Sequence, residues 1–146
     1  MSLKSTLAVL FFSVLSLLPV ACKQPSDTVT VVSVIDGDTI VIEGGYHVRY
    51  IGIDSPEADE SYYSEAKQMN IDLLAGRKVR LESDITDKDK YGRLLRYIFV
   101  DDMFVNAEMV RQGCAWAYAY QPDVKYQVYL EAMEKEARQL KRGFWR

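Results

Sequence analysis

The feature that most constrains the fold is a series of short segments rich in β-branched residues, which fills the middle of the chain. Residues that favour turns separate several of them, as "EGG" does at 43–45. Short segments bounded in this way are typical of strands. We therefore predict five strands and a turn at Asp101-Asp102 that leads into "MFVN". The predicted strands are 29–35, 39–42, 47–53, 78–83 and 94–100.

Three other stretches have helical features. Ser64 could cap the first helix, Gly76 lies beyond its end, and Gly113 stops the short second helix. The third has apolar residues spaced three or four apart, which predicts that they face the core: Tyr129, Leu130, Met133, Ala137 and Leu140. Five strands and three helices predict an α+β, mainly β fold, built as a small closed or partly open barrel with helices packed on it. The predicted helices are 65–74, 106–112 and 126–140.

Residues 1–22 resemble an export signal. A basic residue, Lys4, precedes an apolar run from Leu7 to Val20, which is short for a membrane-spanning helix. Cys22 follows soon after that run, as in bacterial lipoprotein signals, although Pro19 stands where such signals usually have leucine. Two interpretations stay open. Either Cys22 carries a lipid that anchors the protein to the membrane, or the signal is cleaved and the protein is secreted or periplasmic.

The rest of the chain is long enough for one folded domain. A polar tether at 23–28 precedes a domain predicted to span 29–146. Only Cys114 lies within that domain, so an internal disulfide is excluded there, and its apolar surroundings predict a small buried side chain. The single histidine, His47, lies in a predicted strand beside a turn and is predicted to be a surface residue.

The net charge does not suggest a nucleic-acid-binding protein. The whole chain carries −3, and Lys4 is the only charge in the first 21 residues, so the remainder is near −4. Nucleic-acid-binding proteins usually have a strong basic excess. A bound cation and a few well-placed arginines could offset the acidic residues locally, so the charge alone does not exclude that class.

Acidic residues gather at both ends of the stretch "IDGDTIVIEGGYHVRYIGIDSPE". Asp36 and Asp38 stand at one end and Asp54 and Glu57 at the other, with a single arginine, Arg49, between them. Acidic turns bind hard cations such as Ca²⁺, although the same residues could serve only to form a turn. An arginine binds two phosphate oxygens at once. The stretch therefore predicts a site for a cation and a phosphate.

An EF-hand does not account for these acids. The twelfth residue counted from Asp36 is His47 rather than the glutamate that an EF-hand loop requires, and "DKDKYG" at 87–92 fails the same test. A metal site here must therefore draw ligands from separate segments, with Asp38 and Asp54 supplying one carboxylate each.

Strand geometry raises a difficulty for this site. Along a regular strand, Arg49 and Asp54 would project from opposite faces, because side chains alternate. Gly52 lies between them and permits a bulge or bend that would re-aim the side chains. The sequence does not decide between the regular strand and the bent one.

Four motifs, "IDGDT", "VRYIGIDSPE", "DKYGR" and "VNAEMVRQG", resemble those of the staphylococcal nuclease (thermonuclease-like) family in order and spacing. The similarity runs from about Val31 to Trp145. It implies an OB-fold five-stranded barrel with three packed helices. It also implies a monomer that depends on Ca²⁺ and cleaves DNA and RNA, preferentially single-stranded, leaving 3′-phosphate ends.

The resemblance also implies roles for individual residues. Asp38 and Asp54 match calcium ligands, and Ser55 stands where the family commonly has threonine and contributes its backbone carbonyl. Arg49 and Arg93 match the two arginines that hold the phosphate. The residue that matches the general base, or an orienter of the attacking water, is Glu57.

Four further residues match substrate contacts of the family: Lys90, Tyr91, Tyr118 and Tyr120. The two later tyrosines could also belong partly to the core. Residues 58–64, "ADESYYS", form a shorter and more acidic loop than the family's lysine-rich one, which affects the expected affinity for substrate. The alternative is a non-catalytic binding module of the same fold. Such modules lose the acids or the arginines, whereas this chain has all of them.

Overall fold

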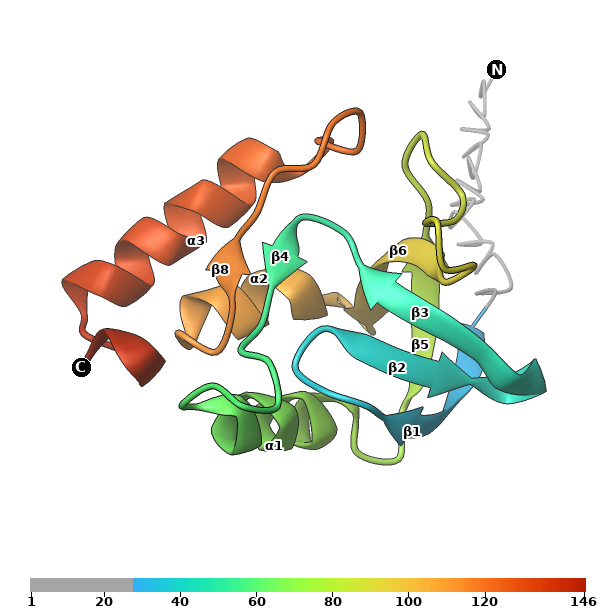
Figure 1. Ribbon diagram of the computed structural model, residues 1–146, viewed down its shortest axis with the longest axis horizontal. Helices are drawn as coiled ribbons and strands as arrows, with labels where there is room; N and C mark the ends of the chain where they lie inside the picture. The colour runs from blue at the N-terminus through green and yellow to red at the C-terminus, as the bar shows by residue number, and fades with distance from the viewer. Residues whose placement is uncertain (1–27) are drawn as a thin grey trace, which may run out of the picture.

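The computed structural model describes residues 28–146, which contain eight strands and three α-helices (Figure 1). The strands are β1 (Thr28–Val34), β2 (Thr39–Ile42), β3 (Tyr46–Tyr50), β4 (Ile53–Asp54), β5 (Lys78–Glu82), β6 (Leu94–Val100), β7 (Met103–Phe104) and β8 (Trp116–Ala117). The helices are α1 (Tyr63–Leu74), α2 (Val105–Arg111) and α3 (Gln127–Gln139). The predicted signal and lipidation cysteine lie outside the described residues.

The main sheet closes on itself. Its strands follow the order β3-β2-β1-β5-β6-β7, and β3 also pairs with β6 in parallel, which joins the two ends. β1 links the two halves because its first residues pair with β5 and its last residues pair with β2. The predicted five-stranded barrel with three helices is confirmed, with β7 as a short addition.

The predicted strand at 47–53 is wrong in its second half. β3 ends at Tyr50, the chain turns at Ile51 and Gly52, and Ile53 begins a separate strand, β4. Gly52 has φ 78°, a value that glycine adopts readily and other residues adopt at a cost. β4 leaves the barrel and pairs with β8, with Ile53 opposite Ala117. The sequence did not predict β8.

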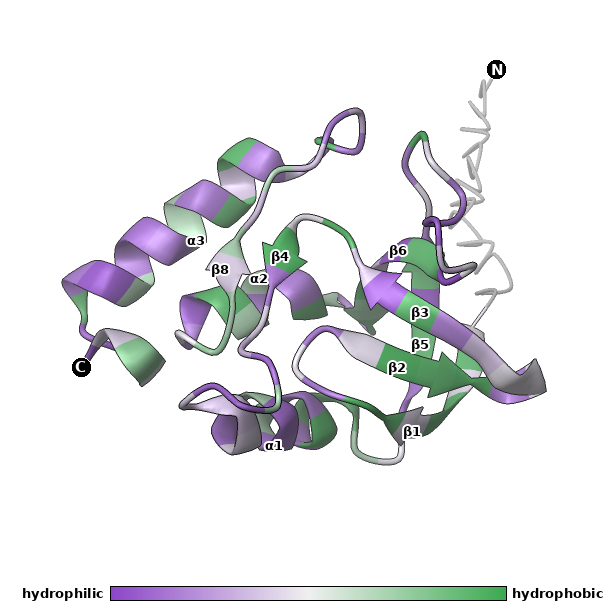
Figure 2. Ribbon diagram, in the orientation of Figure 1, coloured by the Kyte–Doolittle hydropathy of each residue, from purple (hydrophilic) through white to green (hydrophobic). Residues whose placement is uncertain are grey.

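Two expectations about the helices need correction. α1 begins at Tyr63, so Ser64 lies inside the helix, and Tyr62, the residue before it, has a left-handed backbone and no side-chain capping bond. On α3, Tyr129 and Leu140 are exposed rather than in the core. The predicted face holds for the other three residues: Leu130 and Ala137 are buried, and Met133 packs partly buried against the core. Figure 2 shows α3 as a mixture of hydrophilic and hydrophobic residues along its length.

The core lies inside the barrel and beneath the helices. Side chains from β2, β3, β5 and β6 meet those of α2 and Leu130 of α3 in one buried cluster. Cys114 belongs to this cluster, and burial raises the pKa of its thiol to about 11. Its thiol is therefore protonated at neutral pH and unreactive. His47 is exposed, as predicted. Within residues 28–146, none of the helices has both the length and the apolar character needed to cross a bilayer.

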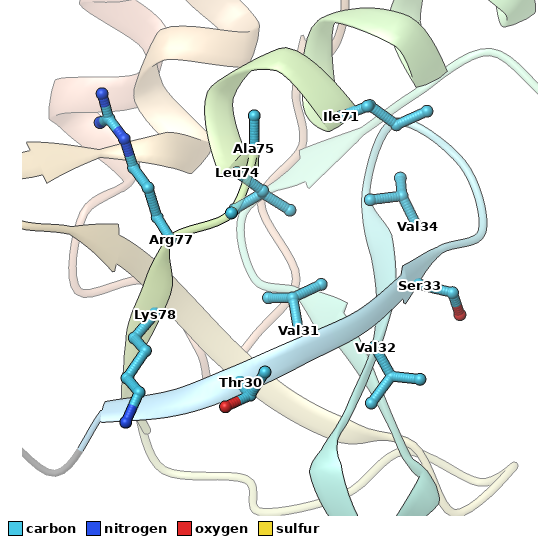
Figure 3. Close-up of a pocket in the computed structure, with 11 residues that line it drawn as sticks. Thr30, Val31, Val32, Ser33, Val34, Ile71, Leu74, Ala75, Arg77 and Lys78 are labelled. Atoms are coloured by element: carbon cyan, nitrogen blue, oxygen red, sulfur yellow. The ribbon is translucent and has the colours of Figure 1, made fainter.

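A pocket of about 410 Å³ lies between β1 and the end of α1 (Figure 3). Its walls are mainly aliphatic, with Val31 and Leu74 facing each other across it and Arg77 and Lys78 at one side. It shares no residue with the predicted nuclease site.

Candidate active site

The bend at Gly52 brings Arg49 and Asp54 together. Nη2 of Arg49 donates to Oδ1 of Asp54 over 2.7 Å. Nη1 donates to two backbone carbonyls at the ends of the bend, those of Tyr50 at 2.7 Å and Ile53 at 2.8 Å. The side-chain alternation of a regular strand is thus broken at the glycine, and the question left open by the sequence is answered in favour of the bend.

Asp38 approaches the same guanidinium from the turn before β2. Its Oδ1 lies 3.1 Å from Nε of Arg49. Oδ1 also accepts the hydroxyl hydrogen bond of Thr39 at 3.0 Å, and Oδ2 accepts the backbone N–H of Ser55 at 2.7 Å. Asp38 is buried and fixed by these bonds, whereas the side chain of Asp54 remains 45% exposed. The two predicted metal-binding carboxylates therefore both contact the Arg49 guanidinium, Asp38 at Nε and Asp54 at Nη2.

This arrangement places negative charge where it is poorly solvated. Burial raises the pKa of Asp54, and the charge of Arg49 opposes that effect only in part. Burial and the neighbouring charge of Asp38 also raise the pKa of Asp36. Carboxylates in such surroundings favour a cationic partner, because a nearby positive charge stabilises their ionised form.

The donor chemistry of this cluster fits a hard cation. Asp38 and Asp54 supply carboxylate oxygens and Ser55 a backbone carbonyl, which are the ligand types that Ca²⁺ takes. No group of three or more His, Cys, Asp or Glu side chains within residues 28–146 is arranged to hold a metal ion. A calcium ion here would therefore rely on few protein ligands and on water or substrate for the rest of its coordination.

Glu57 lies three residues beyond Asp54, in the turn that leads towards α1. It is exposed, and its backbone is fixed by Glu60, whose carboxylate accepts the Glu57 N–H at 2.8 Å and whose own N–H donates to the Glu57 carbonyl at 2.8 Å. Its side chain is therefore open to solvent, three residues along the chain from Asp54.

Arg93 is held by Asp89 at the end of the loop before β6. Oδ2 of Asp89 accepts from Nε of Arg93 at 2.7 Å, and Oδ1 accepts the backbone N–H groups of Tyr91 and Arg93. Burial alone would raise the pKa of Asp89, but these hydrogen bonds outweigh it and lower the pKa. Because β6 pairs in parallel with β3, with Leu95 opposite Arg49, the loop that holds Arg93 comes to the strand that carries Arg49.

The four predicted substrate-contacting residues lie on two exposed loops. Tyr91 is 73% exposed, and Nζ of Lys90 lies 5.0 Å from its ring centre. Tyr118 and Tyr120 are 54% and 66% exposed, which contradicts a core role for either. Tyr118 is tied to the bend, since its N–H donates to the carbonyl of Gly52 at 2.9 Å.

The sequence did not reveal how Asp123 joins these two loops. Oδ1 of Asp123 accepts the backbone N–H groups of Ile85 and Thr86, and its own N–H donates to the carbonyl of Tyr120. This buried side chain therefore links the loop of Tyr120 to the segment that leads to Arg93.

The buried pair of Tyr50 and Asn70 was also not predicted from the sequence. The Tyr50 hydroxyl donates to Oδ1 of Asn70 at 2.9 Å, and Nδ2 of Asn70 donates to the carbonyl of Asp36 at 2.9 Å. Asp36 Oδ1 in turn accepts the N–H of Asp38. Asn70 lies four residues from both Ala66 and Leu74, so the three residues share one face of the predicted helix. A polar residue on that apolar face was the sequence signal that could have revealed the pair.

Comparison with known proteins identifies the family of this chain. The family described as "Staphylococcal nuclease homologue" matches residues 47–146. The chain belongs to the staphylococcal nuclease family. It is 37% identical over 127 residues to "Thermonuclease" of Staphylococcus hyicus, which covers 81% of this chain and 75% of that protein.

Two further relatives of this nuclease are named as endonucleases. "Endonuclease YncB" of Bacillus subtilis (strain 168) is 39% identical over 128 residues, 80% of this chain and 61% of that protein. An "Uncharacterized endonuclease" of Escherichia coli O157:H7 is 38% identical over 120 residues, which are 79% of this chain and 74% of that protein. The resemblance seen in the four motifs is confirmed, and this member of the staphylococcal nuclease family is a nuclease that acts on nucleic acid.

Proposed function

We propose that this protein is an exported nuclease that requires Ca²⁺ and hydrolyses phosphodiester bonds of DNA and RNA, preferring single strands and leaving 3′-phosphate ends. The observation that carries the proposal is the meeting of Asp38 and Asp54 on Arg49. These contacts place carboxylate oxygens, which are ligands of hard cations, beside a guanidinium, which binds phosphate.

Hydrolysis of a phosphodiester builds negative charge on the phosphoryl oxygens, and fixed positive groups stabilise that charge. Arg49 and Arg93 present guanidinium groups for this purpose, and each can bind two oxygens. Calcium bound by Asp38 and Asp54 would supply further positive charge and polarise the phosphoryl group. Glu57 accepts a proton from the attacking water, or orients that water.

Arg49 begins this process with most of its donors already occupied. Four of its hydrogen bonds and contacts are already made within the protein, to two carboxylates and two carbonyls. A guanidinium has five N–H donors, so a phosphate can be gripped at two points only if Arg49 gives up at least one of these bonds. Breaking at least one bond to a carboxylate or a carbonyl is therefore part of a two-point contact with phosphate.

The decisive assay uses the mature domain from Val29 with single-stranded DNA and with RNA. Cleavage is expected with Ca²⁺ and should stop when a chelator is added. A parallel titration with Mg²⁺ tests the metal preference. Undiminished cleavage in excess chelator would contradict the metal requirement, and binding without cleavage under both metals would favour the non-catalytic module.

Export rests on the sequence of residues 1–22, followed by the tether at 23–28 and the domain at 29–146. If Cys22 carries a lipid, Cys22→Ser should move the protein from the membrane fraction to a soluble fraction. Identical fractionation of the two forms would favour cleavage and secretion instead.

A further inference from the structure

A second pocket, of about 340 Å³, lies beside Arg93. Two segments far apart in the sequence form its walls: the turn and first residues of β3, and the loop that ends at Arg93. The lining residues are Gly45, Tyr46, His47, Tyr91, Gly92 and Arg93. The roles assigned above involve Arg93 and Tyr91 but leave Tyr46 and His47 without a function.

Closure of the barrel places this pocket at the start of the strand that carries Arg49. Val48 of β3 pairs with Leu94 of β6, so the residues before them, His47 and Arg93, stand side by side at the strand ends. His47 and Arg49 are two residues apart on β3 and therefore project from the same face, roughly 6.6 Å from each other along the strand. A strand of nucleic acid bound at Arg49 could reach the pocket with its next phosphate.

The aromatic rings of the pocket are open to solvent. Tyr46 is 57% exposed and Tyr91 is 73% exposed. The Tyr46 ring packs against the turn at Gly44, where an added Cβ would come within 2.8 Å of the ring. Cζ of Arg93 lies 5.7 Å from the centre of the Tyr91 ring. Exposed aromatic rings beside cationic groups bind single-stranded nucleic acid, because bases stack on the rings and phosphates meet the charges.

We propose that this pocket is a second nucleotide subsite, which takes a neighbouring nucleotide of a single-stranded substrate whose scissile phosphate lies at Arg49. Its base stacks on Tyr46, and His47 donates a hydrogen bond to the adjoining phosphate. The subsite extends the substrate path away from Tyr118 and Tyr120. In Figure 1 the hairpin between β2 and β3 lies at the opposite end of β3 from the loop that follows β8. The inference rests on the proposed nuclease function and specifies how that function selects single strands.

Substrate length provides the test. An aryl phosphodiester of a single nucleotide has no second base to stack, whereas an oligonucleotide of about eight nucleotides lies within the usual site size of an OB fold. Tyr46→Ala should raise KM for the oligonucleotide roughly ten-fold, as expected for one lost stacking contact. It should leave kcat and the aryl ester unchanged. His47→Ala should act in the same direction, and His47→Gln, which keeps an N–H donor, should restore part of the loss.

The matched control is Tyr129→Ala, because Tyr129 is a similarly exposed tyrosine on α3. Fluorescence anisotropy of a labelled oligonucleotide, measured in chelator, reports binding without cleavage and should show the same loss for Tyr46→Ala. Unchanged KM and unchanged binding in both variants would overturn the subsite, as would an equal loss on the aryl ester. Failure of the wild type to cleave would contradict the proposed function instead, and anisotropy would still decide the subsite.

Discussion

Gly52 lies directly against Leu130 of α3, and a Cβ added to the glycine would come within 2.5 Å of Cδ1 of that leucine. Leu130 is buried, and Gly52 also has the positive φ that ends β3. One residue therefore sets both the bend that brings Arg49 to Asp54 and the close approach of α3 to the barrel. Neither requirement can be met by a residue with a side chain unless something moves.

The first prediction is that Gly52→Ala lowers both stability and activity. A left-handed backbone costs a non-glycine residue roughly 1–2 kcal/mol, and overpacking a core adds about 1–3 kcal/mol. Displacement of the bend should also reduce kcat by separating Arg49 from Asp54. Gly76→Ala is the matched control, since Gly76 has φ +67° but no neighbour within 4 Å. In the control, denaturant unfolding should show only the cost of the left-handed backbone, and steady-state kinetics should show no loss of activity. Equal losses of stability and activity in both variants would contradict the role of the Leu130 contact.

The second prediction concerns the buried link from Tyr50 through Asn70 to the turn of Asp38. Asn70→Ala leaves the Tyr50 hydroxyl and the Asp36 carbonyl without their partner, which should cost about 1–3 kcal/mol of unfolding free energy. The loosened turn should raise the Ca²⁺ concentration needed for half-maximal binding, as measured by calorimetry.

Gln68→Ala provides the comparison for Asn70→Ala, because Gln68 lies on the exposed side of the same helix and bonds only to Asp72 there. It should change neither quantity appreciably. If Asn70→Ala lowers stability but leaves calcium binding at the wild-type level, Asn70 supports the fold and does not position Asp38.

Gly52 and Asn70 also show which parts of the structure could be predicted from the sequence and which could not. The strand and helix segments were predicted closely because their apolar periods and turn residues are local signals. The acidic residues and arginines of the candidate site were located from motifs. The break at Gly52 could not be predicted, since a glycine permits both a regular strand and a bend, and the choice depends on the contact with Leu130 78 residues away. The link through Asn70 could not be predicted for the same reason, because it depends on a tertiary contact with Tyr50.

The third prediction concerns pH and the ion pair of Asp89 with Arg93. Hydrogen bonds lower the pKa of Asp89 in the folded protein, despite its burial. A lowered pKa means that the ionised form stabilises the fold above the unfolded value of about 3.9, and that this stabilisation is lost as the pH falls through the folded value. The melting temperature of wild type should therefore exceed that of Asp89→Asn at neutral pH, and the gap should narrow below about pH 4. A gap that is constant with pH would show that the charge of Asp89 is not what holds Arg93.

The fourth prediction tests Glu57 as the residue that acts on water. Glu57→Gln should lower kcat roughly 10²–10³-fold, a loss typical of a catalytic proton acceptor. KM should change little, because the role proposed for this side chain is to act on water rather than to bind the substrate. Asp59→Asn is a suitable control, since Asp59 is an exposed acid in the same turn region. Retention of more than about a tenth of the wild-type rate would be well outside that expected loss and would rule out the assignment.

The fifth prediction separates the two tasks of Arg49, which organises the bend and holds the phosphate. Arg49→Lys keeps the positive charge, but an ammonium group cannot contact both carboxylates and both carbonyls with the geometry of a guanidinium. Unsatisfied carbonyls at Tyr50 and Ile53 should cost about 1–3 kcal/mol of stability. Loss of the two-point phosphate contact should reduce kcat roughly 10²–10³-fold. Steady-state kinetics and denaturant unfolding measure the two effects on the same preparations.

Arg138→Lys is the control for Arg49→Lys. Arg138 pairs with Glu134 one turn away on α3, and its side chain is 55% exposed. Exposed pairs of this kind contribute about 0.3–0.5 kcal/mol, so this change should leave both stability and activity close to wild type. A stable but inactive Arg49→Lys would assign Arg49 to phosphate binding alone. A fully active Arg49→Lys would contradict the two-point clamp, because a lysine can offer the phosphate only a point charge.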